Sequence, residues 1–88
     1  MPKFMGIHTL PPGGITREQL DQLAQAAQQD PTVSGYRSFI NLSQGKAVCI
    51  FEAPDKEVLA AWFQKMGLPY DSITQLELEG DHGVIQEA

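Results

Sequence analysis

The chain is poor in cysteine, in positive charge and in long hydrophobic runs. Cys49 is the single cysteine among its 88 residues, so no disulfide can form within one chain, which fits a reducing compartment. Apolar runs such as Ala47–Phe51 are far shorter than the ~20 residues that span a bilayer. The start of the chain also lacks the apolar segment of a secretory signal. We therefore expect a cytoplasmic protein without a membrane partner.

Positive charge is scarce because only six Lys and Arg residues accompany eleven Asp and Glu residues, giving a formal net charge of −5 at pH 7. This balance disfavours attraction to phosphate backbones, so nucleic acid is not an expected partner. The hydrophobic content of 42% suffices for one core, and 88 residues are too few for two. We expect a single domain over residues 1–88, in which residues 80–88 form a polar tail.

Two helices are predicted by their capping residues and apolar stripes. Thr16 and Gln19 have the spacing of a capping box, and the helix that they begin should end at Asp30 because Pro31 follows. Asp55 offers a second N-cap, and glycine and proline end the helix after it. The apolar stripe of this second helix is formed by Leu59, Trp62, Phe63 and Met66.

Four strands are predicted by alternation and composition. Lys3–Thr9 and Ile73–Glu79 alternate with the period of two that is typical of a strand. Val33–Ser43 and Lys46–Ala53 are rich in β-branched and aromatic residues. Only Gln44-Gly45 separates these two segments, which predicts a hairpin with a two-residue loop.

The two-residue loop fixes an expected register for this hairpin. Arg37 would lie opposite Glu52 as a cross-strand ion pair, and Ile40 would lie opposite Cys49.

The predicted order of elements is βαββαβ, which indicates a ferredoxin-like α+β sandwich. Its four-stranded antiparallel sheet would have the first and third strands at the centre and both helices on one face. The other face would stay open although it is partly apolar. Because exposed apolar patches of this kind usually mark interfaces, we expect a homodimer that stacks open face on open face.

Face assignment follows from which side of each strand is more apolar. We expect the more apolar side to pack beneath the helices, and this side comprises Met5, Ile7, Tyr36, Ile40, Leu42, Ala47, Cys49, Phe51, Ala53, Leu76 and Leu78. The open face would then present polar groups within an apolar rim, which suits a small polar site. These residues are His8, Arg37, Asn41, Glu52, Gln75, Glu77 and Glu79, among Phe4, Phe39, Val48 and Ile50.

A divalent metal site is one interpretation of this open face. His8 and Glu77 would converge from neighbouring strands, Glu52 would add a second carboxylate, and imidazole with carboxylate suits nickel, copper or zinc. The alternatives are structural: His8 as a hydrogen-bonded histidine at a strand end, Glu77 as a solvated edge residue, and Glu52 as the partner of Arg37.

Cys49 has two interpretations as well. It would be a thiolate ligand only if it shared a face with His8, and otherwise it is an inert buried thiol. Asp81-His82 in the polar tail is expected to form a solvated turn. The chain contains no Cys-x-x-Cys, phosphate-binding loop or nucleophile elbow.

Several segments together resemble a family of small bacterial proteins, once catalogued as a domain of unknown function and now described as nickel-binding, with a dimeric ferredoxin-like fold. The resemblance spans nearly the whole chain. It rests on Met1–Met5 with His8, the Pro12–Gly14 connector before Thr16, the run Lys46–Asp55 with its Cys-x-x-Glu-Ala-Pro-Asp pattern, and the run Gly67–Ile73. The resemblance implies nickel or a related divalent transition metal as the bound ion.

The expected function is therefore noncatalytic binding of a divalent metal, nickel first, for storage or sensing by a homodimer. An alternative is an enzyme, because small ferredoxin-like dimers include monooxygenase-like and haem-degrading proteins. Its pocket would lie between sheet and helices and would be lined by Tyr36, Phe39, Trp62 and Phe63. A third alternative is an interaction module without a ligand.

Overall fold

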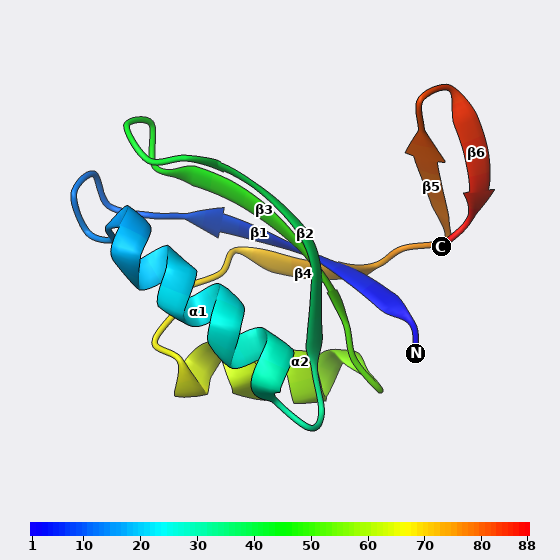
Figure 1. The fold of residues 1–88 in the computed structure, drawn as a ribbon, viewed down its shortest axis with the longest axis horizontal. Helices are drawn as coiled ribbons and strands as arrows, with labels where there is room; N and C mark the ends of the chain where they lie inside the picture. Colours follow the sequence, from blue (N-terminus) through cyan, green and yellow to red (C-terminus); the bar gives the residue numbers. More distant parts are fainter.

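Four strands form an antiparallel sheet in the order β2-β3-β1-β4, and both helices cover one of its faces (Figure 1). The computed structural model describes all residues, 1–88. Its elements are β1 (Lys3–Thr9), α1 (Arg17–Gln29), β2 (Ser34–Asn41), β3 (Lys46–Glu52), α2 (Lys56–Lys65), β4 (Ser72–Gln75), β5 (Leu78–Asp81) and β6 (Val84–Glu87). The α+β architecture is consistent with the predicted ferredoxin-like fold, and β1 and β3 are central as predicted.

Both helices begin at the predicted N-caps. The Thr16 hydroxyl accepts from the Gln19 amide at 3.1 Å, and the Gln19 side chain accepts from the Thr16 amide at 2.9 Å, so the capping box is complete. The Asp55 carboxylate accepts from the Val58 amide at 2.8 Å. Neither helix is long and apolar enough to cross a membrane.

The C-terminal end of α2 is closed by a Schellman motif. The Leu68 amide donates to the Phe63 carbonyl at 2.9 Å, and the Gly67 amide donates to the Gln64 carbonyl at 3.1 Å. Gly67 has a φ of +68°, in the left-handed region that this motif requires. The chain then turns back toward the end of β1 at Pro69 and Tyr70.

The predicted register of the β2–β3 hairpin is wrong. The loop comprises residues 42–45, so Ile40 lies opposite Ala47 and Arg37 lies opposite Ile50 instead of Glu52. The physical reason is Gly45, whose φ is +68° and whose carbonyl accepts from the Leu10 amide at 2.8 Å. This bond holds the loop against the end of β1, and a further irregularity at Tyr36 shifts the register again.

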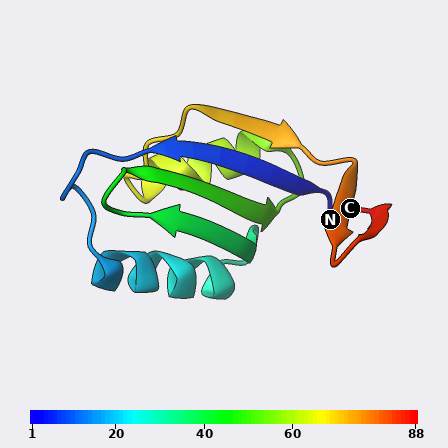
Figure 2. The same cartoon turned by 90° about the horizontal axis from the view of Figure 1, so that it is seen from above.

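The predicted final strand is divided in two. β4 pairs with β1 only as far as Gln75 opposite Phe4, because β1 itself begins one residue before Phe4. The chain then bends at residues 76–77, and residues 78–87 form a separate two-stranded sheet, β5–β6. Residues 80–88, which we expected to be a polar tail, thus contribute most of a hairpin that stands away from the sandwich (Figure 2).

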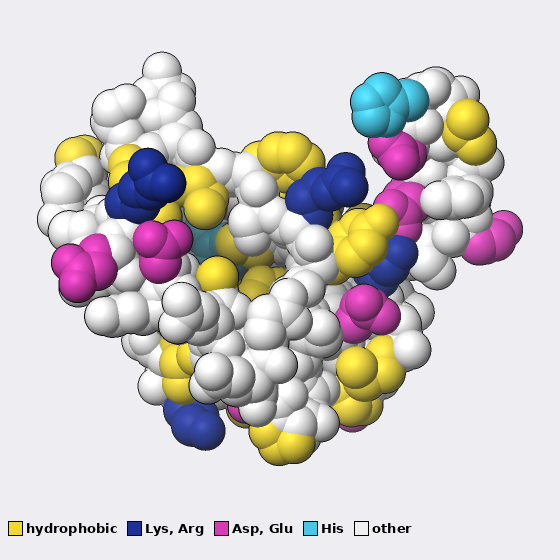
Figure 3. All heavy atoms as spheres, in the orientation of Figure 1, with side chains coloured by type: hydrophobic (Ala, Val, Ile, Leu, Met, Phe, Trp, Pro, Cys, Tyr) yellow, Lys and Arg dark blue, Asp and Glu magenta, His cyan; other side chains and the backbone are white.

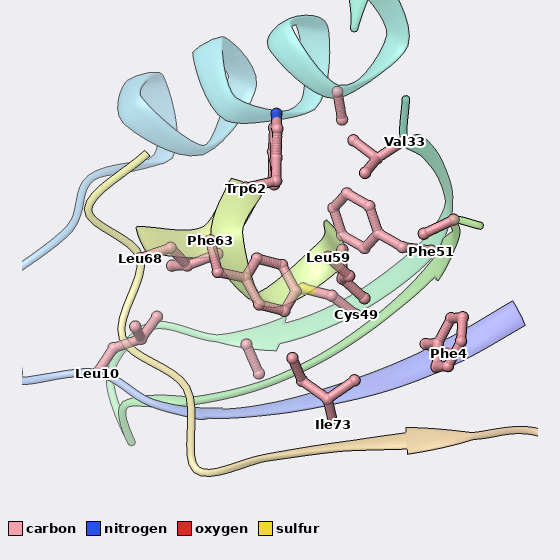
Figure 4. Packing of buried hydrophobic residues seen from close by; sticks show 13 residues of the cluster. Phe4, Leu10, Val33, Cys49, Phe51, Leu59, Trp62, Phe63, Leu68 and Ile73 are labelled. Carbon is pink, nitrogen blue, oxygen red and sulfur yellow. The ribbon is translucent and has the colours of Figure 1, made fainter. Parts of the chain in front are cut away.

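The core lies between the sheet and α2. Its buried apolar residues are Phe4, Leu10, Ala27, Val33, Ala47, Cys49, Phe51, Ala53, Leu59, Trp62, Phe63, Leu68 and Ile73 (Figure 4). Three of them belong to α2 and one to α1. The rings of Phe63 and Phe51 are 5.5 Å apart with an interplanar angle of 89°, a favourable edge-to-face arrangement.

The predicted faces of β3 are confirmed, whereas those of β1 are wrong. Ala47, Cys49 and Phe51 point toward the helices as expected. In β1, however, Phe4 and His8 are buried on that side, and Met5 and Ile7 lie on the open face. The pairing of β1 with β3 places Met5 opposite Ile50 and Ile7 opposite Val48, so these four apolar residues share the open face.

Candidate functional site

His8 lies beneath α2. It is the one polar residue among the buried side chains, and only 1% of it is exposed. Its Nδ1 is 2.8 Å from the Pro69 carbonyl oxygen, which can only accept, so Nδ1 carries the proton. The Phe63 ring meets the imidazole edge-on, with centroids 5.0 Å apart. Nε2 is buried without a hydrogen-bond partner. The prediction that His8 projects from the open face is therefore wrong.

Gly6 explains why this side of β1 faces the helices. A Cβ atom at Gly6 would lie 3.0 Å from Nε2 of His8 and 3.1 Å from the Phe63 ring. Only glycine leaves room for an aromatic ring of α2 to approach the strand so closely. The apolarity of Met5 and Ile7 pointed the other way, and Gly6 was the signal in the sequence that indicated the correct face.

Cys49 shares the helix-covered side with His8. It lies opposite Gly6 on β3, and burial raises the pKa of its thiol above the ordinary value, an effect that a hydrogen bond with Ser38 partly offsets. A buried thiol with a raised pKa stays protonated near pH 7, and a protonated thiol is a poor metal ligand. The inert interpretation of Cys49 agrees with this environment.

Glu52 and Glu77 lie at the opposite end of β1 from His8. Glu52 is opposite Lys3, and Glu77 follows Leu76, whose amide donates to the Lys3 carbonyl at 2.9 Å. With a rise of about 3.3 Å per residue, Lys3 and His8 are about 16 Å apart along the strand. The prediction that His8 and Glu77 converge is therefore wrong. Neither Glu52 nor Glu77 lies near the His8 imidazole.

The Lys3 end of β1 carries a compact charged cluster instead. The Lys3 ammonium donates to one oxygen of the Glu79 carboxylate, and the Tyr36 hydroxyl donates to the other at 2.6 Å. The same ammonium lies 4.0 Å above the centre of the Tyr36 ring. The hydrogen bond from Lys3 holds the pKa of Glu79 below its ordinary value, and the bond to Glu79 raises the pKa of Lys3. Tyr36 was expected beneath the helices and lies on the open side, which corrects that prediction.

A histidine and a carboxylate do meet in one place, at the tip of the β5–β6 hairpin. Nδ1 of His82 is 2.6 Å from Oδ1 of Asp81, and both side chains are largely exposed. The prediction for this pair is a solvated turn. The turn itself agrees with that view, because His82 and Gly83 have φ values of +50° and +84°, as a two-residue hairpin turn needs.

The chain alone does not offer a complete metal site. No three His, Cys, Asp or Glu side chains are grouped so that they could hold an ion. The buried Nε2 of His8 is enclosed by Gly6 and Phe63, which provide no ligand, and the exposed Asp81 and His82 make only a pair. The residues of one chain therefore do not fit a nickel ion, which requires further ligands.

The aromatic residues assigned to an enzyme pocket do not lie together. Trp62 and Phe63 pack against each other in the core, whereas Tyr36 and Phe39 are exposed on the open side. The partly open cavity between α1 and the sheet, which Trp62 and Cys49 line, measures about 100 Å³. Pockets for flat cofactors such as haem are several times larger, so this cavity gives the enzyme alternative no support.

The fold and these groups define a small α+β protein of ferredoxin-like type, with a buried histidine, carboxylates at one end of the sheet and one sheet face left open. The profile of the family described as "Nickel responsive protein SCO4226-like" matches residues 4–76, and the chain belongs to this family. A crystal structure of SCO4226 from Streptomyces coelicolor A3(2) is similar, with 27% sequence identity and a TM-score of 0.72. The match covers 89% of this chain and 99% of that chain. No curated protein matches the chain.

Proposed function

We propose that this chain is a noncatalytic nickel-binding protein that acts as a homodimer. The observation that carries the proposal is the match of residues 4–76 to a nickel-responsive family. Because one chain lacks a complete ligand set, a bound ion would draw ligands from two copies. The homodimer is supported by the open sheet face, where Phe39 is 60% exposed beside Ile7 and Val48.

Two of the four candidate ligands stay accessible in the folded chain. Glu52 and Glu77 lie at the surface near Lys3, whereas His8 and Cys49 could reach an ion only if the core opened. Nickel favours imidazole in addition to carboxylate, and His82 is the exposed histidine. We therefore propose Glu52 and Glu77 as carboxylate ligands and His82 as the imidazole.

Calorimetric titration of untagged full-length protein with nickel chloride tests this proposal. We expect saturable binding that weakens about tenfold or more in Glu52→Gln, Glu77→Gln and His82→Ala. Glu57→Gln, which removes an exposed carboxylate from the first turn of α2, is the matched control and should bind as the wild type does. Binding should also weaken as the pH falls, because protons compete with the metal ion for its ligands.

The outcomes separate the function from the ligands. Absence of saturable nickel binding would overturn the proposed function. Unchanged binding in the three variants, with a loss in His8→Ala, would keep the function and show that the core opens to form the site.

A further inference from the structure

The C-terminal hairpin, residues 78–87, lies outside the part of the chain that matches the family. It lies beyond residue 76, where the family match ends, and no residue after Ile73 belongs to the core. Two-stranded hairpins are at best marginally stable in water by themselves. The hydrogen bonds from Lys3 and Tyr36 to Glu79 attach this one to the open side of the sheet. An element that adds nothing to the core and is nevertheless attached in one orientation calls for another role.

The two faces of the hairpin differ in chemistry. Glu79 lies opposite Gln86 and Asp81 lies opposite Val84, so these four side chains share one face. Leu78 and Ile85 lie on the other face, and the Ile85 side chain covers Gly80. Because Glu79 points to Lys3 and Tyr36 on the open side of the sheet, the face that carries Asp81 and Val84 is turned toward the sheet. We call it the inner face.

The inner face borders a hollow above the open sheet face. Figure 3 shows this hollow between the hairpin and the loop that joins β2 to β3, with hydrophobic side chains at its floor. A surface depression of about 390 Å³ forms part of it and is lined by Ile7, Phe39, Asn41, Lys46 and Val48. The hollow is thus apolar at its floor and open to a partner.

The charges of the two surfaces are complementary. No Lys or Arg follows Lys65. The inner face of the hairpin carries Asp81 and also Glu79, which is paired with Lys3 of the same chain, whereas Glu87 lies opposite Leu78 on the other face. The open face carries Arg37 and Lys46, and neither makes an ion pair within the chain. Basic groups without acidic partners on one surface and a carboxylate without a Lys or Arg partner, Asp81, on the other favour contact between two copies.

We propose that the C-terminal hairpin is a dimerisation arm, which contacts a second copy of this chain seated in the hollow through its inner face. Asp81 of each arm then meets the basic residues of the other copy, and Val84 packs at the contact. This inference rests on the homodimer proposed above. It adds that the arm, which lies beyond the family match, supplies a large part of the dimer affinity.

The neighbouring residues Val84 and Ile85 provide a matched test because they are 61% and 67% exposed and lie on opposite faces. Sedimentation equilibrium of metal-free full-length protein in EDTA gives the dimer dissociation constant. We expect Val84→Asp to raise this constant at least about tenfold and Ile85→Asp to change it by less than about twofold. Arg37→Glu should also raise it, and added salt should weaken the wild-type dimer.

Truncation after Glu77 is a second test that leaves every core residue in place. The truncated chain should fold with the same α-helical circular dichroism and dissociate at least about tenfold more readily than the full-length chain. Equal dimer dissociation constants for full-length, Val84→Asp and truncated protein would contradict the role of the arm but not the proposed homodimer. A full-length chain that stays monomeric would overturn the arm and the proposed dimer together, while nickel binding by calorimetry tests the function separately.

Discussion

The two helices cover the same sheet face but differ in how they are attached to it. α2 buries Leu59, Trp62 and Phe63 in ten residues, whereas α1 buries only Ala27 in thirteen. In Figure 2, α1 lies beside the β2 edge and α2 lies behind the β1 and β4 side of the sheet. Packing of large side chains supplies most of the stability of a small domain. The comparison indicates that α2 and β1 form the stable part of the fold and that α1 covers a looser side.

The largest expected effect comes from removing the ring at the centre of the α2 side. Phe63→Ala should lower the free energy of unfolding by about 3–5 kcal/mol, because Phe63 is fully buried against the rings of His8 and Phe51. Leu23→Ala, the corresponding change on the half-buried stripe of α1, should cost about 1 kcal/mol. Urea unfolding followed by Trp62 fluorescence measures both. Similar losses would contradict the difference between the helices.

Two glycines test how closely each helix approaches the sheet. Gly6→Ala should cost about 1–3 kcal/mol, because the new Cβ would lie 3.0 Å from His8 and 3.1 Å from Phe63. Gly35→Ala on the α1 side should be tolerated within about 0.5 kcal/mol, since its Cβ would lie 3.7 Å from that of Ala27. Thermal unfolding of the two variants measures both changes in stability. If Gly35→Ala proved as harmful as Gly6→Ala, α1 would be packed as tightly as α2.

Removing the N-cap side chain of either helix should destabilise that helix by about the same free energy. Thr16→Ala and Asp55→Ala should each cost about 1 kcal/mol. Cys49 reports on the outcome, because it lines the small cavity beneath α1 and its burial raises the pKa of its thiol. We expect Thr16→Ala to accelerate labelling of Cys49 by a thiol reagent more than Asp55→Ala does. Equal acceleration would mean that the cavity opens only by global unfolding.

The smallest expected effect is on acid stability at the C-terminal end of α1. Hydrogen bonds from the Thr32 hydroxyl and amide lower the pKa of Asp30 below its ordinary value of 3.8. The stabilisation is therefore present above pH 3.8 and is lost as the pH falls through the lower folded value. Asp30→Asn should destabilise the protein at neutral pH, and its difference from the wild type should shrink in strong acid. Urea unfolding at both pH values measures this, and a constant difference would contradict it.

The elements of the sandwich could be predicted because their signals are local. Thr16 with Gln19 and Asp55 mark helix starts through bonds within one turn, alternation marks β1, and β-branched and aromatic residues mark β3. Which side of β1 faces the helices could not be decided by counting apolar residues, because both sides of the strand are apolar. What decides it is the approach of Phe63 to Gly6, which is a tertiary contact.

The hairpins and the candidate site depended on contacts that the sequence does not display. The β2–β3 loop is set by a bond from Leu10 to Gly45, which are distant in sequence. The C-terminal hairpin depends on Glu79 meeting Lys3 and Tyr36. Among the four candidate ligands, the strand face was predicted correctly for the two on β3. Glu52 lies on the open face opposite Lys3, and Cys49 lies beneath the helices.

The bond between Leu10 and Gly45 also has a consequence for protein engineering. A Cβ atom at Gly45 would lie 2.1 Å from the Leu10 carbonyl oxygen, whereas a Cβ at Gly13 would meet nothing within 4 Å. Any cargo spliced into the chain, such as a reporter domain, would therefore separate two joined loops at residue 45 but would leave the sandwich intact at residues 12–14. The connector before α1 is thus the place at which this fold can be lengthened.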